Sequence, residues 1–159
     1  MSEELRPSAQ KVRQALHALG LACEIVQMHA MTRSAEDAAR AVGCRVAQIV
    51  KSLIFEGRQS HQPILVAASG VNRVNENTLE RHVSEPVKMA NADYVREKTG
   101  FAIGGVPPVG HPNPLNTFID EDLLQHEVIW AAAGTPHAVF KLTPEQLKMI
   151  THGTVISVK

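Results

Sequence analysis

The run Ile49-Val50-Lys51-Ser52-Leu53-Ile54-Phe55 predicts a β-strand. β-Branched and aromatic residues dominate this run, and Glu56 with Gly57 ends it. Residues 64–68, Ile-Leu-Val-Ala-Ala, repeat the pattern shortly afterwards. Two such runs joined by a short polar connection are typical of neighbouring strands. We therefore expect residues 49–55 and 64–68 to pair within one sheet.

Helical and strand patterns interleave on both sides of this pair. Helices are predicted over residues 8–19, from Ser34 to near Gly43, and over residues 75–83, 91–99 and 143–150. Further strands are predicted over residues 22–27, 118–119, 128–130, 138–142 and 155–156. No linker, repeat or low-complexity tract separates them, and 159 residues suit one hydrophobic core. The sequence thus predicts one mixed α/β domain, residues 1–159, with a central mixed β-sheet flanked by helices.

The composition excludes several classes of protein. An apolar fraction of 44% with 20% charged residues is typical of a globular domain. Sixteen basic residues balance sixteen acidic ones, which argues against a protein that coats long nucleic-acid backbones. Residues 1–7 are acidic and polar, and no apolar run approaches the roughly 20 residues that cross a bilayer. We therefore expect a cytoplasmic protein without membrane contact, in which Cys23 and Cys44 are buried or half-buried thiols.

The loop Gly104-Gly105-Val106-Pro107-Pro108-Val109-Gly110 is the most informative segment for function. Glycine leaves its backbone N–H unshielded, and consecutive prolines fix the neighbouring dihedral angles. Such a loop can hold open amide donors around an oxyanion or a ribose. We interpret residues 99–103 as a strand end that delivers the amides of Gly104 and Gly105 to a sheet edge.

Lys51 requires an explanation because it interrupts an apolar run. One explanation is a strand lysine whose ammonium reaches water along the protein surface. The other places the ammonium in a pocket, where it binds a substrate carbonyl, phosphate or ribose oxygen and stabilises developing negative charge. The sequence leaves both open. Ser52 is expected on the opposite face of the strand, so the two residues do not form a nucleophilic pair.

Other catalytic and metal-binding motifs are missing from the sequence. No spacing among the eight histidines, alone or with the two cysteines, matches a zinc site. Nucleophile-elbow, phosphate-loop and dinucleotide motifs are also missing. His111 and His137 lie near predicted loops, and His137 follows a turn where it could shape a small-molecule pocket. We predict neither a metal nor a cofactor.

Four ordered segments carry a resemblance to a known family: residues 50–55, 64–66, 99–110 and 117–121. With the hairpin of residues 130–142 and the terminal segment 142–158, they resemble the YbaK/prolyl-tRNA synthetase-associated domain family over nearly the whole chain. Members of this family are similar to the editing domain inserted in bacterial prolyl-tRNA synthetases. They hydrolyse the ester between a wrong amino acid and a tRNA.

The resemblance implies roles for particular residues. Lys51 matches the family's essential lysine, and Gly104 with Pro108 matches its Gly-x-x-x-Pro loop. From the residues and the resemblance together, we predict Lys51, Gly104 and Gly105 as catalytic residues and Ser52, Pro108, Ala133, Gly134 and His137 as substrate-binding residues. Some members carry a serine near the position of Ala132 or Ala133, whereas residues 131–133 are all alanine here. A role that depends on that serine is therefore not transferred.

The implied function is a free-standing aminoacyl-tRNA deacylase. Its substrate would be the acceptor end of a mischarged tRNA, with a small amino acid on tRNA-Pro or a related tRNA, and an aminoacyl-tRNA synthetase would be a second partner. Two alternatives stay open: a non-catalytic module that holds an aminoacyl-tRNA end or a nucleotide for a synthetase, and a metal-independent hydrolase of another small ester. Pocket shape discriminates amino acids by only about 1 to 3 kcal/mol per methylene, so the sequence does not identify the amino acid that is cleared.

Overall fold

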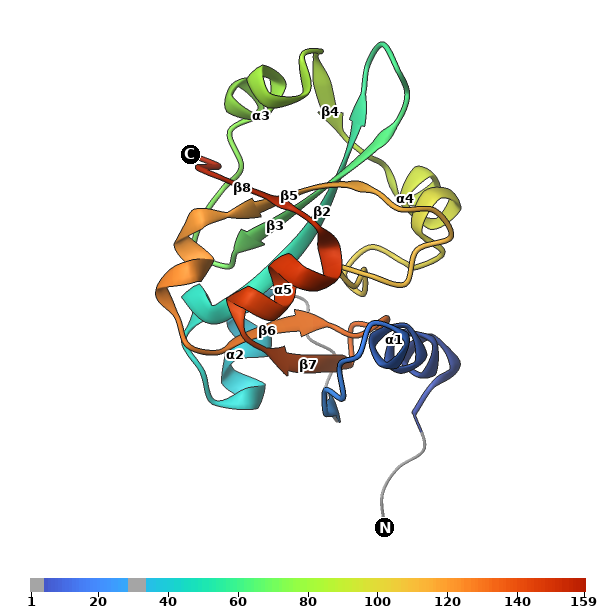
Figure 1. Cartoon of the computed structure of the whole chain (residues 1–159), viewed down its shortest axis with the longest axis vertical. Helices are drawn as coiled ribbons and strands as arrows, with labels where there is room; N and C mark the ends of the chain where they lie inside the picture. Colours follow the sequence, from blue (N-terminus) through green and yellow to red (C-terminus); the bar gives the residue numbers. More distant parts are fainter. Residues whose placement is uncertain (1–4, 29–33) are drawn as a thin grey trace.

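An eight-stranded mixed β-sheet is the central feature of the computed structural model, which describes residues 5–28 and 34–159 (Figure 1). Its strands are β1 (Ile25–Gln27), β2 (Ile49–Gly57), β3 (Pro63–Ser69), β4 (Val87–Met89), β5 (Asn116–Asp120), β6 (Ile129–Ala132), β7 (Ala138–Leu142) and β8 (Thr154–Ile156). The strand order is β1-β7-β6-β2-β3-β5-β8, and β4 pairs with β2 beside this path. β2 runs antiparallel to β3 and parallel to β6. The predicted mixed α/β fold and the predicted pairing of its first two strand runs are confirmed.

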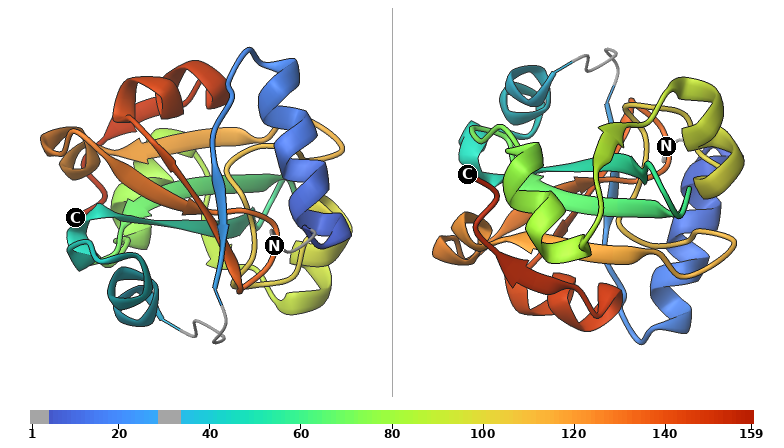
Figure 2. Two further views of the ribbon diagram at one scale, coloured as in Figure 1. Left: turned by 90° about the horizontal axis from the view of Figure 1, so that it is seen from below. Right: turned by 90° about the horizontal axis from the view of Figure 1, so that it is seen from above.

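Helices cover both faces of this sheet. They are α1 (Pro7–Ala18), α2 (Ala35–Val42), α3 (Glu76–Val83), α4 (Ala92–Thr99) and α5 (Pro144–Thr151), with 3₁₀ turns at Val46–Gln48 and Glu121–Gln125. α1 and α5 share a buried apolar cluster with Val50 and Ile54 of β2. α3 packs with Phe55, and α2 packs with Ile49, in two separate clusters. Figure 2 shows α5 and α2 on opposite sides of the sheet. All five predicted helices are present.

Polar caps and glycines define the helix ends, and one of these ends overturns a prediction. The Ser34 hydroxyl accepts the Asp37 N–H at 3.1 Å at the start of α2. Gly100 ends α4 in the left-handed conformation, with φ of 81°. The chain then turns, because the Thr99 hydroxyl accepts the Phe101 N–H at 3.0 Å. Residues 99–103 are therefore not a strand end as predicted: Thr99 closes α4, and a loop follows that continues to β5.

Two short strands also differ from the predictions. β1 begins at Ile25 rather than at residue 22. β4 is not predicted at all, because its three residues carry no strand pattern of their own and depend on pairing with residues 55–57 of β2. Separately, the longest helix of the described ranges has 12 residues, and none combines the length and hydrophobicity needed to cross a membrane.

The two edges of β2 differ, and this difference positions the site. Along one edge, β3 pairs with every residue from Val50 to Glu56. Along the other edge, β6 pairs only with Ile49 and Val50, and β4 pairs only from Phe55 onward. Residues 51–54 consequently have no strand partner on this second edge within the described chain. We call residues 51–54 the open edge of β2.

Candidate active site

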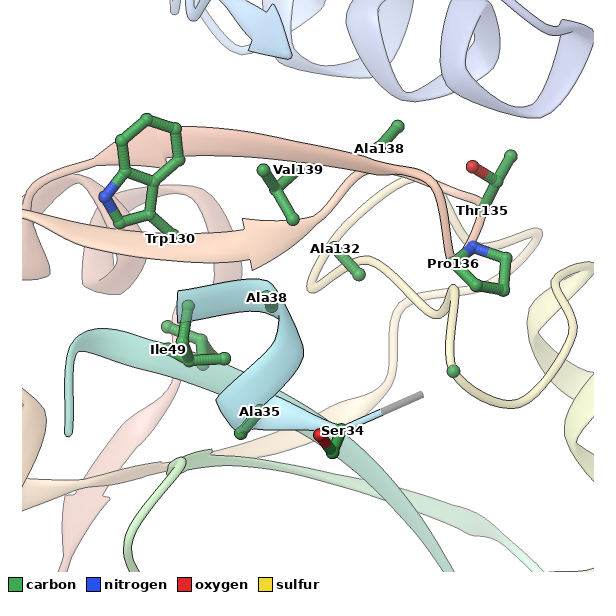
Figure 3. A pocket seen from close by; sticks show the side chains of 12 residues that line it. Ser34, Ala35, Ala38, Ile49, Trp130, Ala132, Thr135, Pro136, Ala138 and Val139 are labelled. Carbon is green, nitrogen blue, oxygen red and sulfur yellow. The ribbon is translucent and has the colours of Figure 1, made fainter. Parts of the chain in front are cut away.

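A cavity of about 330 Å³ lies at the open edge of β2. It is lined by residues 50–54, by Met89, Ala90 and Val95, by Ile103, Gly104 and Val106, and by Ala132. A second cavity of about 160 Å³ shares Val50, Gly104 and Ala132 with the first. Figure 3 shows the second cavity between the start of α2, with Ser34 and Ala35, and the β6–β7 turn, with Thr135 and Pro136. Because the two cavities share three lining residues, we refer to them together as the cleft.

Lys51 lies in this cleft with its ammonium held by the protein. Its Nζ donates a hydrogen bond to the main-chain oxygen of Asn72 at 2.6 Å. Burial lowers the pKa of Lys51, the charges of Glu36 and Asp120 oppose this effect, and the charge of Arg73 adds to it. Of the two explanations that the sequence left open, the geometry matches the one that places Lys51 in a pocket.

A buried polar network fixes the acceptor of Lys51. Asp120 is completely buried. Its carboxylate accepts the Ser69 N–H at 3.0 Å, the Asn72 side-chain amide at 2.8 Å and the Asp122 N–H at 2.9 Å. The same Asn72 amide also donates to Asp122 at 2.7 Å. Asn72 is therefore anchored through its side chain while its main-chain carbonyl holds Lys51.

Ser52 follows Lys51 but points to the other face of the sheet, as predicted. Val50 and Ile54 lie on the same face of β2 as Ser52 and belong to the apolar cluster of α1 and α5. Phe55 lies on the same face as Lys51 and belongs to the apolar cluster of α3. The Ser52 hydroxyl is buried and has no hydrogen-bond partner among the described residues. A buried hydroxyl without a partner is rare, because it loses its hydration without compensation.

The two glycines of the loop differ in their surroundings. Gly104 is exposed, has a φ of 92°, and lines both cavities. The Gly105 N–H, in contrast, donates to the Ala102 carbonyl at 3.0 Å. A Cβ on Gly105 would lie 2.7 Å from the Thr135 Cα, so glycine is needed there for close packing. The prediction of an open amide at Gly105 is therefore wrong, because the loop itself uses that amide.

Four further predicted residues lie outside the lining of these two cavities. Pro108 lines a separate cavity beside α1 and α5. Ala133 is buried in the core. Gly134 allows close approach of α1, since a Cβ there would lie 2.6 Å from the Ser8 oxygen. The His137 main chain binds the Thr135 hydroxyl and the Met28 N–H. The structure therefore does not bring these four residues into the lining of the cleft.

His111 supports the loop rather than the cleft. Its Nε2 lies 2.8 Å from the Pro107 oxygen, and its ring meets the Phe101 ring edge-on at 6.3 Å. Burial lowers the pKa of His111, the bond to Pro107 opposes this shift, and the charge of Lys11 adds to it. A neutral His111 that donates to Pro107 therefore stabilises the rigid loop that carries Gly104.

Sequence reasoning missed the residues that complete the cleft. Its apolar walls include Met89, Ile103, Trp130 and Pro136. Scattered apolar residues of this kind give no sequence signal. Asp120 did give one, since it is an acidic residue directly after the strand residues Phe118 and Ile119. If Asp120 is interpreted as a buried carboxylate, it predicts a polar network at this end of the sheet.

Comparison with known proteins assigns this fold and cleft to a class. The profile of the aminoacyl-tRNA editing domain family matches residues 29–150, and the chain belongs to this family. The resemblance drawn from the sequence is thereby confirmed. Membership supports a hydrolase that acts on aminoacyl-tRNA.

Individual relatives agree with this assignment. A solved structure described as a "putative trans-editing enzyme for prolyl tRNA synthetase" is 46% identical, with a TM-score of 0.93 and coverage of 98% of this chain and 99% of that one. The "Putative Cys-tRNA(Pro)/Cys-tRNA(Cys) deacylase EbsC" of Enterococcus faecalis is 26% identical over 76% of this chain and 73% of its own length. The proline–tRNA ligase of Thermosipho melanesiensis is 33% identical over 51% of this chain but only 14% of the ligase.

Proposed function

We propose that the protein is a free-standing deacylase that hydrolyses the ester of a mischarged tRNA, with a small amino acid on tRNA-Pro or a related tRNA. One observation carries this proposal: Lys51 and the exposed Gly104 line the same cavity at the open edge of β2. A cation and an open loop on one cavity suit an acyl group that develops negative charge at its carbonyl oxygen. Such a reaction would take place in the cytoplasm, where charged tRNAs are used.

The residues of the cleft suit hydrolysis without a protein nucleophile. The described residues that line the two cavities include the hydroxyls of Ser34, Ser52 and Thr135 but no His, Cys, Asp or Glu. No described His, Asp or Glu lines these cavities to activate a serine, and Ser52 lies on the opposite face of β2 from Lys51. An aminoacyl ester is already reactive, and the neighbouring ribose hydroxyl can assist an attacking water. We assign to Lys51 the anchoring of a substrate oxygen and to the Gly104 amide a contact to the carbonyl or the ribose.

The comparisons support the choice of tRNA without naming it for this chain. One relative is described as acting on Cys-tRNA(Pro) and Cys-tRNA(Cys), and one solved structure is described as serving prolyl tRNA synthetase. A synthetase partner fits the neutral net charge of the chain, because affinity for the tRNA can be supplied by the partner. A small amino acid fits the alanines that line the cleft at the positions 35, 38, 132 and 138.

A panel of mischarged tRNAs tests this function. The purified protein is incubated with tRNA-Pro, tRNA-Ala and tRNA-Cys, each carrying alanine, cysteine, serine or proline, and loss of the aminoacyl bond is followed over time. We expect release from a mischarged tRNA-Pro and none from tRNA-Pro that carries proline. Binding without release from any tRNA would instead favour the non-catalytic module. The observation that favours this alternative is that the described lining of the cleft has no activated nucleophile. Release from simple aminoacyl esters alone would favour the small-ester hydrolase.

A further inference from the structure

Ser52 combines three polar groups that no described residue engages. Its hydroxyl is buried without a partner. Its main-chain N–H and C=O belong to the open edge of β2, where neither β6 nor β4 reaches. It also lines the larger cavity beside Lys51. Buried polar groups of folded proteins are almost always paired, so this concentration at one residue points to a ligand.

Hydrogen bonds of neighbouring residues on β2 define the direction of the Ser52 main-chain groups. The Ile54 carbonyl accepts the Ala90 N–H at 3.0 Å, on the β4 side of β2. The Gly57 N–H donates to Gln62 at 3.1 Å, on the β3 side. Main-chain groups on a strand alternate between its two edges, so the N–H and C=O of Ser52 share the edge used by Ile54. Both groups therefore face the open edge and the cavity.

The chain stops pairing just before it would reach Ser52. β4 runs antiparallel to β2, with Phe55 opposite Met89 and Glu56 opposite Lys88. This register would place Ala92 opposite Ser52. Ala92 instead begins α4, whose cap is the Asn91 side chain on the Tyr94 N–H at 2.9 Å. The helix start thus leaves one residue position of the ladder open to the cavity.

We infer that the aminoacyl group of the substrate occupies this position as a one-residue strand on Ser52. This inference rests on the proposed function. An aminoacyl ester carries an α-ammonium donor and a carbonyl acceptor with the spacing of one residue. In an antiparallel hydrogen-bonded pair, two facing residues exchange both bonds with Cα atoms about 5.5 Å apart. The Ser52 carbonyl accepts from the α-ammonium, the Ser52 N–H donates to the ester carbonyl oxygen, and the Ser52 hydroxyl makes a third contact.

This arrangement also supplies a main-chain donor in place of the Gly105 N–H, which is predicted from the sequence to bind the substrate. The Gly105 N–H is occupied by Ala102, so it cannot serve a substrate oxygen. The Ser52 N–H supplies a donor on a regular strand, where its direction is held by the pairing of β2 with β3. It would stabilise the tetrahedral oxyanion together with Gly104. The carbonyl of Ser52 explains how an ammonium binds where the described lining holds no carboxylate.

The test replaces the main-chain N–H of Ser52 by an ester oxygen and keeps the hydroxyl side chain. The α-hydroxy analogue of serine is introduced at position 52 of the full chain by nonsense suppression. This N–H has no partner among the described residues, so we expect only a small fall in Tm, from the weaker ester carbonyl of Lys51 in its pairing with β3. We expect a fall in kcat of about 10²-fold on the tRNA that the wild type deacylates. The matched control is the same replacement at Phe55, whose N–H pairs with β3 opposite Ile64 and which lines neither cavity. That variant should show a lower Tm and a nearly wild-type kcat.

A second measurement separates this inference from the proposed function. The ¹H and ¹⁵N shifts of the Ser52 amide are followed while an unreactive amide-linked aminoacyl-adenosine is added to the wild type. A large shift at Ser52 supports the inference even if no tRNA is deacylated. A wild type that deacylates tRNA, combined with an ester variant of unchanged kcat and a Ser52 amide that does not respond, would overturn the inference and leave the proposed function standing.

Discussion

The two edges of β2 show how one strand serves both stability and function. On the β3 edge, every residue from Val50 to Glu56 has a partner, and the sheet there is continuous. On the other edge, the ladder stops after Val50 and resumes at Phe55. The cavity lies at this interruption. The closed edge fixes the geometry of β2, and the open edge makes that geometry available to a ligand.

The same contrast separates the neighbours Lys51 and Ser52. Lys51 is held by Asn72, which is held in turn by Asp120 and Asp122. Ser52 has a buried hydroxyl with no described partner. The Lys51 ammonium is therefore positioned by the protein before a substrate binds. The Ser52 hydroxyl, in contrast, can gain a hydrogen-bond partner when a ligand binds.

Removal of the Lys51 ammonium should have the largest effect. We expect Lys51→Ala to lower kcat/KM for deacylation by about 10³-fold or more, because it removes the cation at the reacting acyl group. The fold should persist, since the lost contact is one hydrogen bond to a main-chain oxygen. Lys141→Ala, at an exposed position of β7, is the control and should retain activity. Wild-type turnover by Lys51→Ala would remove Lys51 from the mechanism.

Loss of the Asp120 charge should weaken the positioning of Lys51. We expect Asp120→Asn to lower kcat by about 10- to 100-fold and stability by about 1 to 3 kcal/mol, because three hydrogen bonds to the carboxylate are disturbed. Asp120 opposes the burial that lowers the pKa of Lys51, so its removal lowers that pKa further. The charged ammonium is then lost at a lower pH.

The alkaline fall in activity should accordingly begin at a lower pH in Asp120→Asn than in the wild type. Asp93→Asn, at an exposed position of α4, is the control for charge alone and should leave the pH profile unchanged. A loss of stability with an unchanged pH profile would show that Asp120 serves folding and not Lys51.

The two loop glycines should differ in stability when each is replaced by alanine. Gly105→Ala places a Cβ 2.7 Å from the Thr135 Cα and should cost about 1 to 3 kcal/mol by overpacking. Gly104→Ala faces open space, with Pro136 at 3.8 Å, and should cost only about 1 kcal/mol for its positive φ. Urea unfolding of both variants measures the difference. Equal losses would contradict the packing explanation for Gly105.

His111 should make stability depend weakly on pH. Burial lowers the pKa of His111 in the folded state, so the unfolded chain binds more protons in the acidic range. Its contribution is therefore complete above the unfolded pKa of about 6.5 and is lost as the pH falls below it. We expect a lower Tm at about pH 5 than at about pH 7.5. In His111→Gln, which keeps a donor for Pro107, the Tm should fall less; an equal fall would assign the effect to other groups.

The sequence predicts the framework well because the relevant signals are local. Residues 49–55 are recognisable as a strand from their β-branched side chains, and Ser34 and Gly100 mark helix ends by capping chemistry that requires only neighbouring residues. Lys51 and Gly104 are recognisable as candidates because each is unusual in its own segment. The structure then places both at one cavity.

The rest of the site depends on contacts between distant segments. The Gly105 amide is closed by a turn to Ala102 that the composition of the loop does not reveal. The acceptor of Lys51 is a main-chain oxygen of Asn72, and main-chain oxygens look alike in any sequence. The open edge at Ser52 exists because β4 ends and α4 begins where they do. The missing strand partner at Ser52 is therefore not visible in the sequence of β2 itself.

The parallel pairing of β2 with β6 has a consequence for synthesis of the chain. Ile49 lies beside Trp130, and the smaller cavity takes walls from both β6 and β7. A ribosome-bound nascent chain that ends before this hairpin would therefore have Lys51 but would lack the smaller cavity and the Ala132 wall of the larger one. Hydrolytic activity would arise only late in translation, so incomplete chains would not attack charged tRNAs beside the ribosome that is making them.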